Sequence, residues 1–270
     1  MLTVQNWLSN NTLRLMKAGI DSARIDCLVM LEKTLQKQRE WLLAHGEHLI
    51  SHSKEEELNN MLSERLSHNP LAYITGYKEF YSRNFVVNPN VLIPRPESED
   101  IIDSLLMLDR SFIENVIDVG TGSGCLAITA KLELPDIKIV ASDNSENAIF
   151  IAKQNANLLG AKVEFKKSDL LKSITVNDKT VLLANLPYVP DGLITSQEIM
   201  MEPSTAIFSG EEGFDHFIEF WSQLADIKAQ AITVIAESLI NQHVKMMELA
   251  KKSGFNLIRK KGLVQVFLRA

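Results

Sequence analysis

The stretch Val116-Ile117-Asp118-Val119-Gly120-Thr121-Gly122-Ser123-Gly124 decides the fold of this 270-residue chain. It begins as a short apolar strand and runs into a glycine-rich turn, after which residues 126–134 continue as an apolar helix. Glycines at alternate positions accept a positive φ and let the backbone approach a ligand closely at the carboxyl end of a strand. The stretch therefore predicts a strand–turn–helix unit that holds a small ligand.

Two acids further along the chain indicate which ligand. A dinucleotide fingerprint needs a small residue where Cys125 stands, so a cofactor without a pyrophosphate fits better. Asp143 ends a predicted strand over residues 137–143, where an acid accepts hydrogen bonds from ribose hydroxyls. Asp169 follows a predicted strand over residues 162–165 and is placed to take an adenine amino group. Together these features resemble the S-adenosylmethionine site of class I methyltransferases.

A second motif, Asn185-Leu186-Pro187-Tyr188, follows an apolar strand predicted over residues 180–184. An amide or exocyclic amine nitrogen has a delocalised lone pair, so an enzyme that alkylates it must hold both N–H groups. Asn185 and the Pro187 carbonyl supply two acceptors, and Tyr188 supplies a stacking face. The motif is therefore a candidate site for nitrogen methylation.

The pattern of the remaining residues predicts three parts. Residues 1–75 have helical periodicity, with helices expected near 23–35, 40–43 and 54–66, and form a small all-helical domain for substrate docking. Residues 76–95 alternate aromatic and β-branched side chains and are expected to form a linking β-hairpin, with strands 79–87 and 91–93 around a turn at 88–90. Residues 96–270 form the catalytic domain.

The catalytic domain is predicted to be an α/β domain of the Rossmann-like class. Further strands are expected at 231–236, 255–258 and 264–268, the last two as a terminal antiparallel hairpin, and helices at 98–108, 214–224 and 241–252. Strands that alternate with helices imply a mostly parallel sheet. Ligands bind such a sheet where the strand order reverses, so we expect the glycine turn to lie beside Asn185–Tyr188.

Composition excludes several classes of function. The net charge of −6 and the pI near 5.6 argue against binding duplex nucleic acid mainly through phosphates. Cys27 and Cys125 are isolated thiols and are expected in the core of a protein in a reducing cytosol. We expect no metal site, since Gly46 interrupts helical order among the histidines of that region. No segment is long enough to span a bilayer, so the expected location is the cytoplasm. The expected oligomeric state is a monomer.

Over nearly its whole length the chain resembles the PrmC/HemK family. The resemblance rests on the helical preface, on Ile93-Pro94-Arg95-Pro96-Glu97, on the glycine turn and on the Asn-Leu-Pro-Tyr tetrad, and it extends to Glu202-Pro203 and Gly210-Glu211-Glu212-Gly213. Members of this family methylate the glutamine side-chain nitrogen in the Gly-Gly-Gln motif of class I peptide-chain release factors. The resemblance thus implies a protein-(glutamine-N5) methyltransferase with S-adenosyl-L-methionine as cofactor and class I release factors as partners.

The resemblance also implies roles for individual residues at the cofactor. Gly120, Thr121, Gly122, Ser123 and Gly124 would contact the methionine part, and Asp143 the ribose. Asp169 and Leu170 would contact the adenine region, with Leu170 at a place where the family often has an aromatic residue.

At the substrate, the resemblance implies that Asn185 accepts one amide N–H through its side chain and that the Pro187 carbonyl accepts the other. Tyr188 would pack against the glutamine side chain, and Asn185 would also border the cofactor. Leu186 departs from the family, whose tetrad usually reads Asn-Pro-Pro-Tyr, and it leaves only the restriction that Pro187 imposes on its predecessor.

Two other functions remain open at this point. The tetrad Asn-Leu-Pro-Tyr also looks like that of ribosomal-RNA adenine dimethyltransferases, so an adenine-N6 methyltransferase acting on RNA or DNA is one alternative. The other is a non-catalytic binding module that retains the methyltransferase fold. The helical preface, the Ile-Pro-Arg-Pro-Glu segment and the acidic pI favour a protein substrate.

Overall fold

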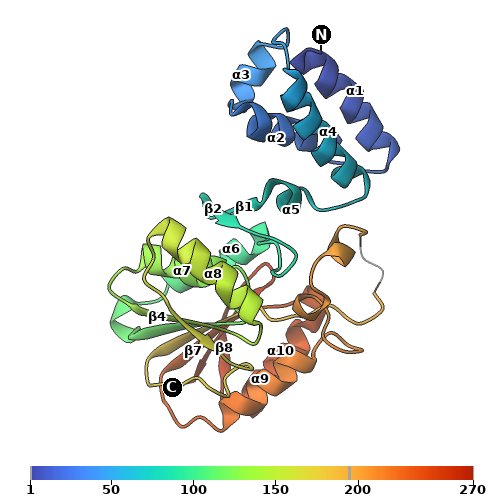
Figure 1. The fold of residues 1–270 in the computed structure, drawn as a ribbon. Helices are drawn as coiled ribbons and strands as arrows, with labels where there is room; N and C mark the ends of the chain where they lie inside the picture. Colours follow the sequence, from blue (N-terminus) through green and yellow to red (C-terminus); the bar gives the residue numbers. More distant parts are fainter. Residues whose placement is uncertain (1, 194–195, 270) are drawn as a thin grey trace. The chain divides into compact units, whose positions relative to one another are not determined.

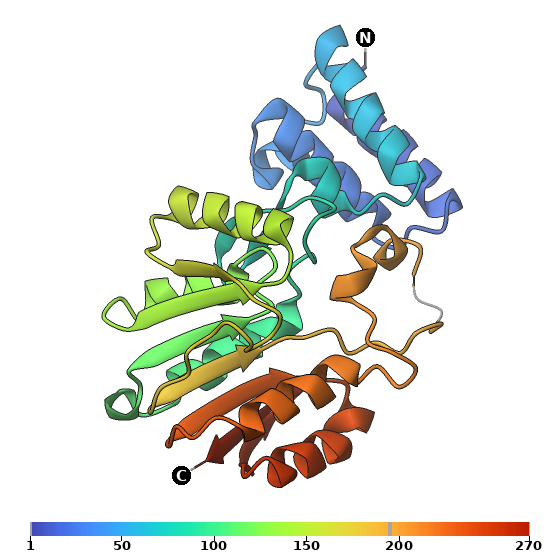
Figure 2. The same ribbon diagram turned by 60° about the horizontal axis from the view of Figure 1, so that its bottom comes forward.

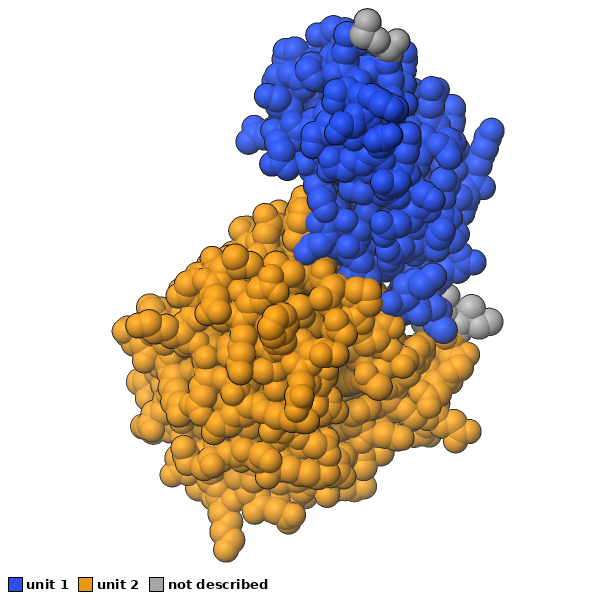
Figure 3. All heavy atoms as spheres, viewed as in Figure 1, with its two compact units in different colours: residues 1–76, 196–201 blue, residues 77–195, 202–270 orange. Residues whose placement is uncertain are grey.

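The chain folds into two compact units (Figure 3). The computed structural model describes residues 2–193 and 196–269. Unit 1 contains Met1–Gly76 together with Ser196–Met201, and unit 2 contains Tyr77–Thr195 and Glu202–Ala270. Most of unit 1 is therefore one continuous segment, to which a short piece from much later in the chain is added.

Unit 1 is helical. Its α-helices are α1 (Val4–Lys17), α2 (Ala23–Leu35), α3 (Arg39–Ala44), α4 (His52–Leu66) and α5 (Leu71–Thr75), and its later segment contains a 3₁₀ turn at Ile199–Met201. Thr3 begins α1, because its hydroxyl accepts a hydrogen bond from the Asn6 N–H at 3.2 Å. Trp7, Met30 and Leu58 from three of these helices lie in one buried apolar core. The helical character expected for residues 1–75 is confirmed.

Unit 2 is built on a mostly parallel sheet. Its strands are β3 (Asn115–Val119), β4 (Lys138–Asp143), β5 (Glu164–Lys167), β6 (Thr180–Ala184), β7 (Ile232–Glu237), β8 (Asn256–Lys261) and β9 (Val264–Arg269). Over the described residues the strand order is β5-β4-β3-β6-β7-β9-β8, with β9 antiparallel to both of its neighbours. The predicted parallel sheet with a terminal antiparallel hairpin is confirmed, and the strand order reverses at β3.

Helices cover both faces of this sheet (Figure 1 and Figure 2). The helices of unit 2 are α6 (Glu99–Leu106), α7 (Cys125–Glu133), α8 (Glu146–Leu159), α9 (Asp215–Ala225) and α10 (His243–Lys252). Val116 of β3 packs in a core with residues of α6, α7 and α8, whereas its neighbour Ile117 packs in a second core with residues of α9 and α10. The period-two alternation of the strand thus divides its side chains between the two layers.

The hairpin before the sheet differs from the expectation. Its strands are β1 (Tyr77–Phe80) and β2 (Arg83–Val86), and residues 88–93 contain no strand. The turn lies at Tyr81 and Ser82, whose φ values are +49° and +58°. Neither residue is one that usually favours such a turn. A turn is present at the predicted place, since the Val91 N–H donates to the Asn88 carbonyl at 3.1 Å, but it does not connect two strands. The prediction was wrong about the hairpin, because the segment predicted as its first strand contains most of β1, the turn and β2.

The third strand of the sheet also begins later than expected. Residues 162–165 were predicted, but β5 spans Glu164–Lys167. The Ala161 N–H still bonds the Ala156 carbonyl at the end of α8, and pairing with β4 begins only at Glu164.

Among the residues with described positions, no helix combines the length and apolar character needed to cross a membrane.

Candidate active site

Parallel pairing of β3 with β6 brings the glycine turn next to the tetrad. Val119 is in register with Ala184, so Gly120 and Asn185 leave the sheet side by side. A Cβ atom on Gly120 would lie 3.2 Å from Cδ2 of Leu186, which is buried. The expectation that these two motifs are neighbours is confirmed, and Leu186 packs directly against the turn.

Both motifs line one cavity of unit 2. Its walls come from the carboxyl ends of the central strands and from the loops around them: Pro89, Asn90, Val91, Leu92, Gly120, Gly122, Asp143, Asn144, Ser145, Ala148, Ser168, Asp169, Leu170, Asn185, Leu186, Pro187, Pro203, Thr205, Ala206 and His216. The cavity holds the carboxylates of Asp143 and Asp169, and none of these described lining residues is Lys or Arg. A wall of this charge disfavours phosphate and suits a cationic nucleoside such as S-adenosylmethionine.

Asp143 ties the glycine turn to the end of β4. Its Oδ2 accepts a hydrogen bond from the Gly122 N–H at 2.9 Å, and its Oδ1 accepts one from the Ser145 N–H at 2.9 Å. A Cβ atom on Gly122 would meet nothing within 4 Å, so the turn faces open space at this point. Burial raises the pKa of Asp143, and the backbone N–H donors oppose that rise.

Three residues of the turn lie behind this surface rather than on it. The Thr121 hydroxyl donates to Asp118, and the Ser123 carbonyl accepts from the Asn155 amide at 2.9 Å. A Cβ atom on Gly124, whose φ is +83°, would lie 2.8 Å from Cδ1 of Ile128. Thr121, Ser123 and Gly124 therefore hold the shape of the turn, while Gly120 and Gly122 border the cavity.

Asp118 is a buried carboxyl group beneath the turn. Its Oδ2 accepts from the Thr121 hydroxyl at 2.6 Å and from the Ala127 N–H at 3.1 Å, and its Oδ1 has no partner among the described residues. Burial raises the pKa of Asp118 to about 7, even though these two donors oppose the rise. The group fixes the start of α7 against β3.

The residues expected near adenine lie on the cavity wall in different ways. Asp169 is exposed and pairs with Lys172 at 2.6 Å, and Leu170 is buried with a φ of +51°. Leu170 contributes both to the cavity and to the core beneath α9. It therefore offers an aliphatic surface to the cavity.

Polar contacts hold the tetrad from below. The Asn185 amide nitrogen donates to the Ser98 hydroxyl at 2.7 Å, and the Tyr188 hydroxyl donates to Oε1 of Glu237 at 2.8 Å. Burial and the adjacent Glu237 raise the pKa of Tyr188 above its ordinary value. Tyr188 packs against the core beneath α9 and lies outside the set of residues that line the cavity.

The backbone after the tetrad is also fixed. The Gln242 amide donates to the Tyr188 carbonyl at 2.8 Å and to the Gly213 carbonyl at 3.2 Å. A Cβ atom on Gly213, whose φ is +68°, would lie 2.5 Å from the Tyr188 carbonyl oxygen, so this position requires glycine. The Gly210–Gly213 segment thus packs directly on the tetrad.

Glu202 joins the loop after the tetrad to the Ile-Pro-Arg-Pro-Glu segment. Its Oε2 accepts from the Ile93 N–H at 3.0 Å, and its Oε1 pairs with Arg95 at 2.5 Å. Both partners lie in unit 2, so this ion pair of Arg95 is internal to that unit. The pair holds two cavity-lining stretches together, residues 89–92 and 203–206.

Sequence reasoning missed several of these residues. They are Ser98, Glu237, Gln242, Pro203, Thr205, Ala206 and His216. One signal was present: Glu237 is a carboxylate directly after the apolar run 231–236, at the same edge as the other motifs. No group of three or more His, Cys, Asp or Glu side chains in the described part of the chain is arranged to hold a metal ion.

Comparison with known proteins identifies the family of this chain. The PrmC N-terminal domain matches residues 6–76, and the methyltransferase small domain matches residues 100–203. A release factor glutamine methyltransferase of Koribacter versatilis is 38% identical over 203 residues, which cover 73% of this chain and 72% of that protein. One from Aliivibrio fischeri is 31% identical over 221 residues, covering 80% of this chain and 78% of that protein.

Solved structures share the fold. A methyltransferase of Pyrococcus furiosus superposes with a TM-score of 0.51 at 16% identity, over 77% of this chain and 96% of that one. The Thermus thermophilus 16S rRNA N2 G1207 methyltransferase, solved with AdoMet and guanosine, gives a TM-score of 0.51 at 14% identity, over 71% of this chain and 48% of that one. The chain is an S-adenosylmethionine-dependent methyltransferase and belongs to the release factor glutamine methyltransferase family.

Proposed function

We propose that this enzyme methylates the side-chain amide nitrogen of glutamine in the Gly-Gly-Gln motif of class I peptide-chain release factors. The observation that carries the proposal is the shared cavity: Gly120 and Gly122 of the turn line it together with Asn185 and Pro187. A methyl donor held by the first pair would meet an amide held by the second. A cytoplasmic location, where translation termination takes place, follows from this substrate.

Asn185 and Pro187 have the chemistry to hold a primary amide. Its nitrogen carries two N–H groups, and the Asn185 side-chain oxygen and the Pro187 carbonyl are two acceptors two residues apart on one loop. With both N–H groups fixed, the lone pair is directed away from them and the nitrogen is stabilised as it becomes pyramidal and positive. When bound, S-adenosylmethionine supplies an electrophilic methyl group on a sulfonium centre. No general base is needed, because the methylated nitrogen is acidic enough to release its proton to water.

The remaining predicted residues take supporting roles in this proposal. Asp143 would hold the ribose, and Asp169 and Leu170 would border the adenine, since all three line the cavity. Thr121, Ser123 and Gly124 would act by shaping the turn around the methionine part. The Tyr188 ring would contact the glutamine side chain with the part of its surface that does not pack on the core. The helical domain, residues 1–75, would dock the folded release factor.

The test is methyl labelling of an intact class I release factor with labelled S-adenosylmethionine. A variant factor with the glutamine of Gly-Gly-Gln replaced by alanine is the matched control, and mass spectrometry locates the added methyl group. Labelling of the first and not of the second supports the proposal. Labelling of RNA or DNA would favour the adenine-N6 reaction instead, and absence of S-adenosylmethionine binding by calorimetry would favour a non-catalytic module.

A further inference from the structure

Ser98 and Glu237 lie directly beneath the candidate catalytic loop, in unit 2. Both are buried: Ser98 precedes α6, and Glu237 is the last residue of β7. Ala184 of β6 is in register with Ala236 of β7, so Asn185 and Glu237 are the next residues on two neighbouring strands. The sheet register itself therefore sets a carboxylate beside the Asn185 side chain, and we call these two residues the Ser98–Glu237 pair.

The hydrogen bonds of this pair run in one direction. The Ser98 hydroxyl accepts a hydrogen bond from the Asn185 amide nitrogen at 2.7 Å, and it lies near enough to the Glu237 carboxylate to lower the pKa of that group as a hydrogen-bond donor. The Tyr188 hydroxyl donates to the same carboxylate at 2.8 Å. A carboxylate accepts hydrogen bonds and does not donate them, so both hydroxyls must point their hydrogens toward Glu237.

This direction determines how the Asn185 amide is turned. Because the single hydrogen of Ser98 is used on Glu237, only lone pairs of Ser98 face Asn185, and these accept from the NH₂ group. The reversed amide would set its oxygen against those lone pairs and leave a buried acceptor without a donor. An amide orientation is usually ambiguous from shape alone, but here the chemistry of the neighbours assigns it.

We propose that the Ser98–Glu237 pair is a positioning device that keeps the oxygen of Asn185 turned toward the cavity, where it accepts the N–H of the substrate amide. Through its second hydrogen bond Glu237 also fixes the Tyr188 hydroxyl, so one carboxylate orients both ends of the tetrad. The inference rests on the proposed role of Asn185 and extends it to two residues that do not themselves line the cavity.

A feature of Glu237 supports a role in orientation rather than in stability. Its Oε2 has no hydrogen-bond partner among the described residues. Burial raises its pKa, as do the nearby acids Glu97 and Asp100, and the hydroxyls of Ser98 and Tyr188 oppose the rise. An incompletely solvated buried carboxylate is unfavourable for folding, and groups of this kind concentrate at functional sites.

The test compares four variants in methyl transfer to the release factor at saturating S-adenosylmethionine. Ser98→Ala removes the hydroxyl that contacts Asn185, and Ser98→Thr keeps a hydroxyl there. Glu237→Gln keeps the size of the side chain but replaces one carboxylate oxygen by an NH₂ donor. Ser104→Ala is the matched control, because Ser104 is a buried serine of α6 whose hydroxyl has no partner among the described residues.

We expect kcat to fall by about 10- to 100-fold in Ser98→Ala and about 10-fold in Glu237→Gln. Ser98→Thr and Ser104→Ala should stay within about 3-fold of the unmodified enzyme, and S-adenosylmethionine affinity should change by less than about 3-fold in every variant.

A second readout does not depend on turnover. The Asn185 side-chain NH₂ resonances, assigned by their absence in Asn185→Ala, should shift in Ser98→Ala and remain in place in Ser104→Ala. Unchanged kcat and resonances in Ser98→Ala would overturn the positioning role, as would equal losses of kcat in Ser98→Ala and Ser98→Thr. If Ser98→Ala does not fold, Glu237→Gln provides the same comparison. The two proposals can fail separately. If the enzyme does not label the release factor but the Asn185 resonances shift in Ser98→Ala, the proposed substrate is refuted and the positioning role is supported.

Discussion

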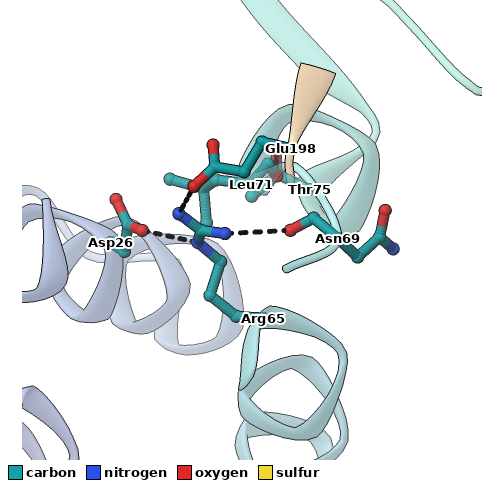
Figure 4. Close-up of polar contacts among 6 residues, drawn as sticks. All are labelled: Asp26, Arg65, Asn69, Leu71, Thr75 and Glu198. Carbon is teal, nitrogen blue, oxygen red and sulfur yellow. Dashed lines mark hydrogen bonds and ion pairs between the residues drawn. The ribbon is translucent and has the colours of Figure 1, made fainter. Parts of the chain in front are cut away.

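Arg65 in unit 1 and Glu237 in unit 2 are both charged and almost inaccessible, with 1% and 0% of their surfaces exposed, yet they are held in opposite ways. Arg65 is surrounded by acceptors: Asp26 at 2.6 Å, Glu198, and the Asn69 carbonyl at 3.3 Å (Figure 4). Glu237 is held by the hydroxyls of Ser98 and Tyr188, and it forms no ion pair with any described residue.

The difference separates a structural charge from a functional one. Burial alone would lower the pKa of Arg65, but hydrogen bonds and attraction from Asp26 and Glu198 raise it above the ordinary value. A compensated charge of this kind fixes how helices meet and is costly to break. The Glu237 carboxylate has no such compensation, so its place beneath the tetrad is better explained by how it orients Asn185 and Tyr188.

Removing Arg65 should have the largest effect. Arg65→Ala leaves Asp26 buried without its cation, so we expect unit 1 to lose about 3–5 kcal/mol of stability. Arg39→Ala is the matched control, because the Arg39–Glu32 pair lies in the same unit but the Arg39 side chain is 43% exposed, and its loss should amount to less than about 1 kcal/mol.

Hydrogen exchange of α2 and α4 peptides would measure both variants, since exchange reports each unit separately. If Arg65→Ala destabilises unit 1 no more than Arg39→Ala does, the buried contacts of Arg65 add little stability. Arg65 would then no longer differ from Glu237 in being a structural charge.

Asn185 should show the reverse pattern, with a large effect on turnover and a small one on folding. Asn185→Ala removes one acceptor for the substrate amide, and we expect kcat to fall by about 10²- to 10³-fold. The affinity for S-adenosylmethionine, measured by calorimetry, should change much less. Equal losses in kcat and in cofactor affinity would mean that Asn185 mainly builds the cofactor pocket.

Asp118 sharpens the comparison through pH, because it is a second buried carboxyl group of unit 2 that forms no ion pair among the described residues. Its pKa is about 7 in the folded protein, against an ordinary value of 3.8 for an exposed aspartate. Between these values the unfolded chain releases the proton and the folded chain keeps it, so stability falls as pH rises through this window. The stabilising contribution is complete below about pH 4 and lost above about pH 7.

Asp118→Asn removes this titration while keeping an oxygen for Thr121 and Ala127. We compare the free energy of unfolding of the variant with that of the unmodified protein. We expect this difference to change in favour of the variant by about 2–3 kcal/mol between pH 5 and pH 7. Urea unfolding at pH 5, 6 and 7, followed through hydrogen exchange of α7, measures it. Parallel pH profiles for the two proteins would show that Asp118 is ionised throughout.

The sequence predicts the site best where short motifs end strands. The glycine turn and Asn185–Tyr188 each follow an apolar strand, and parallel topology alone brings such ends together. The role of Ser98 could not be predicted in the same way, because its contact with Asn185 spans 87 residues and exists only after α6 has packed. Glu237 acquires its role from the register of β7 with β6, which no local pattern specifies.

The hairpin and Arg65 show the same limit. The turn at Tyr81–Ser82 lacks glycine and asparagine and is held by contacts from elsewhere, including the bond from the Tyr81 hydroxyl to Asp103 at 3.1 Å. The sequence pattern around Arg65 is that of an ordinary polar position on an amphipathic helix. In the structure Arg65 is buried because Asp26 and Glu198, from distant parts of the chain, bind its guanidinium. Local periodicity identifies elements, whereas these contacts depend on tertiary structure.

The smallest expected effect is at Glu198, the second acid at Arg65. Glu198 is in Ser196–Met201, which follows the tetrad in the chain but folds with unit 1. Its side chain is 39% exposed, against 4% for Asp26, so water screens it and Glu198→Gln should reduce stability by about 1 kcal/mol or less. Hydrogen exchange should show faster exchange at Met201, whose N–H bonds the Glu198 carbonyl at 3.0 Å, and unchanged exchange in α2. Glu56→Gln, in an exposed pair with His52 in the same unit, is the control. If Glu198→Gln destabilises unit 1 as much as Arg65→Ala does, the charge of Arg65 is balanced mainly by Glu198 rather than by Asp26. Ser196–Met201 would then be an integral part of the helical unit.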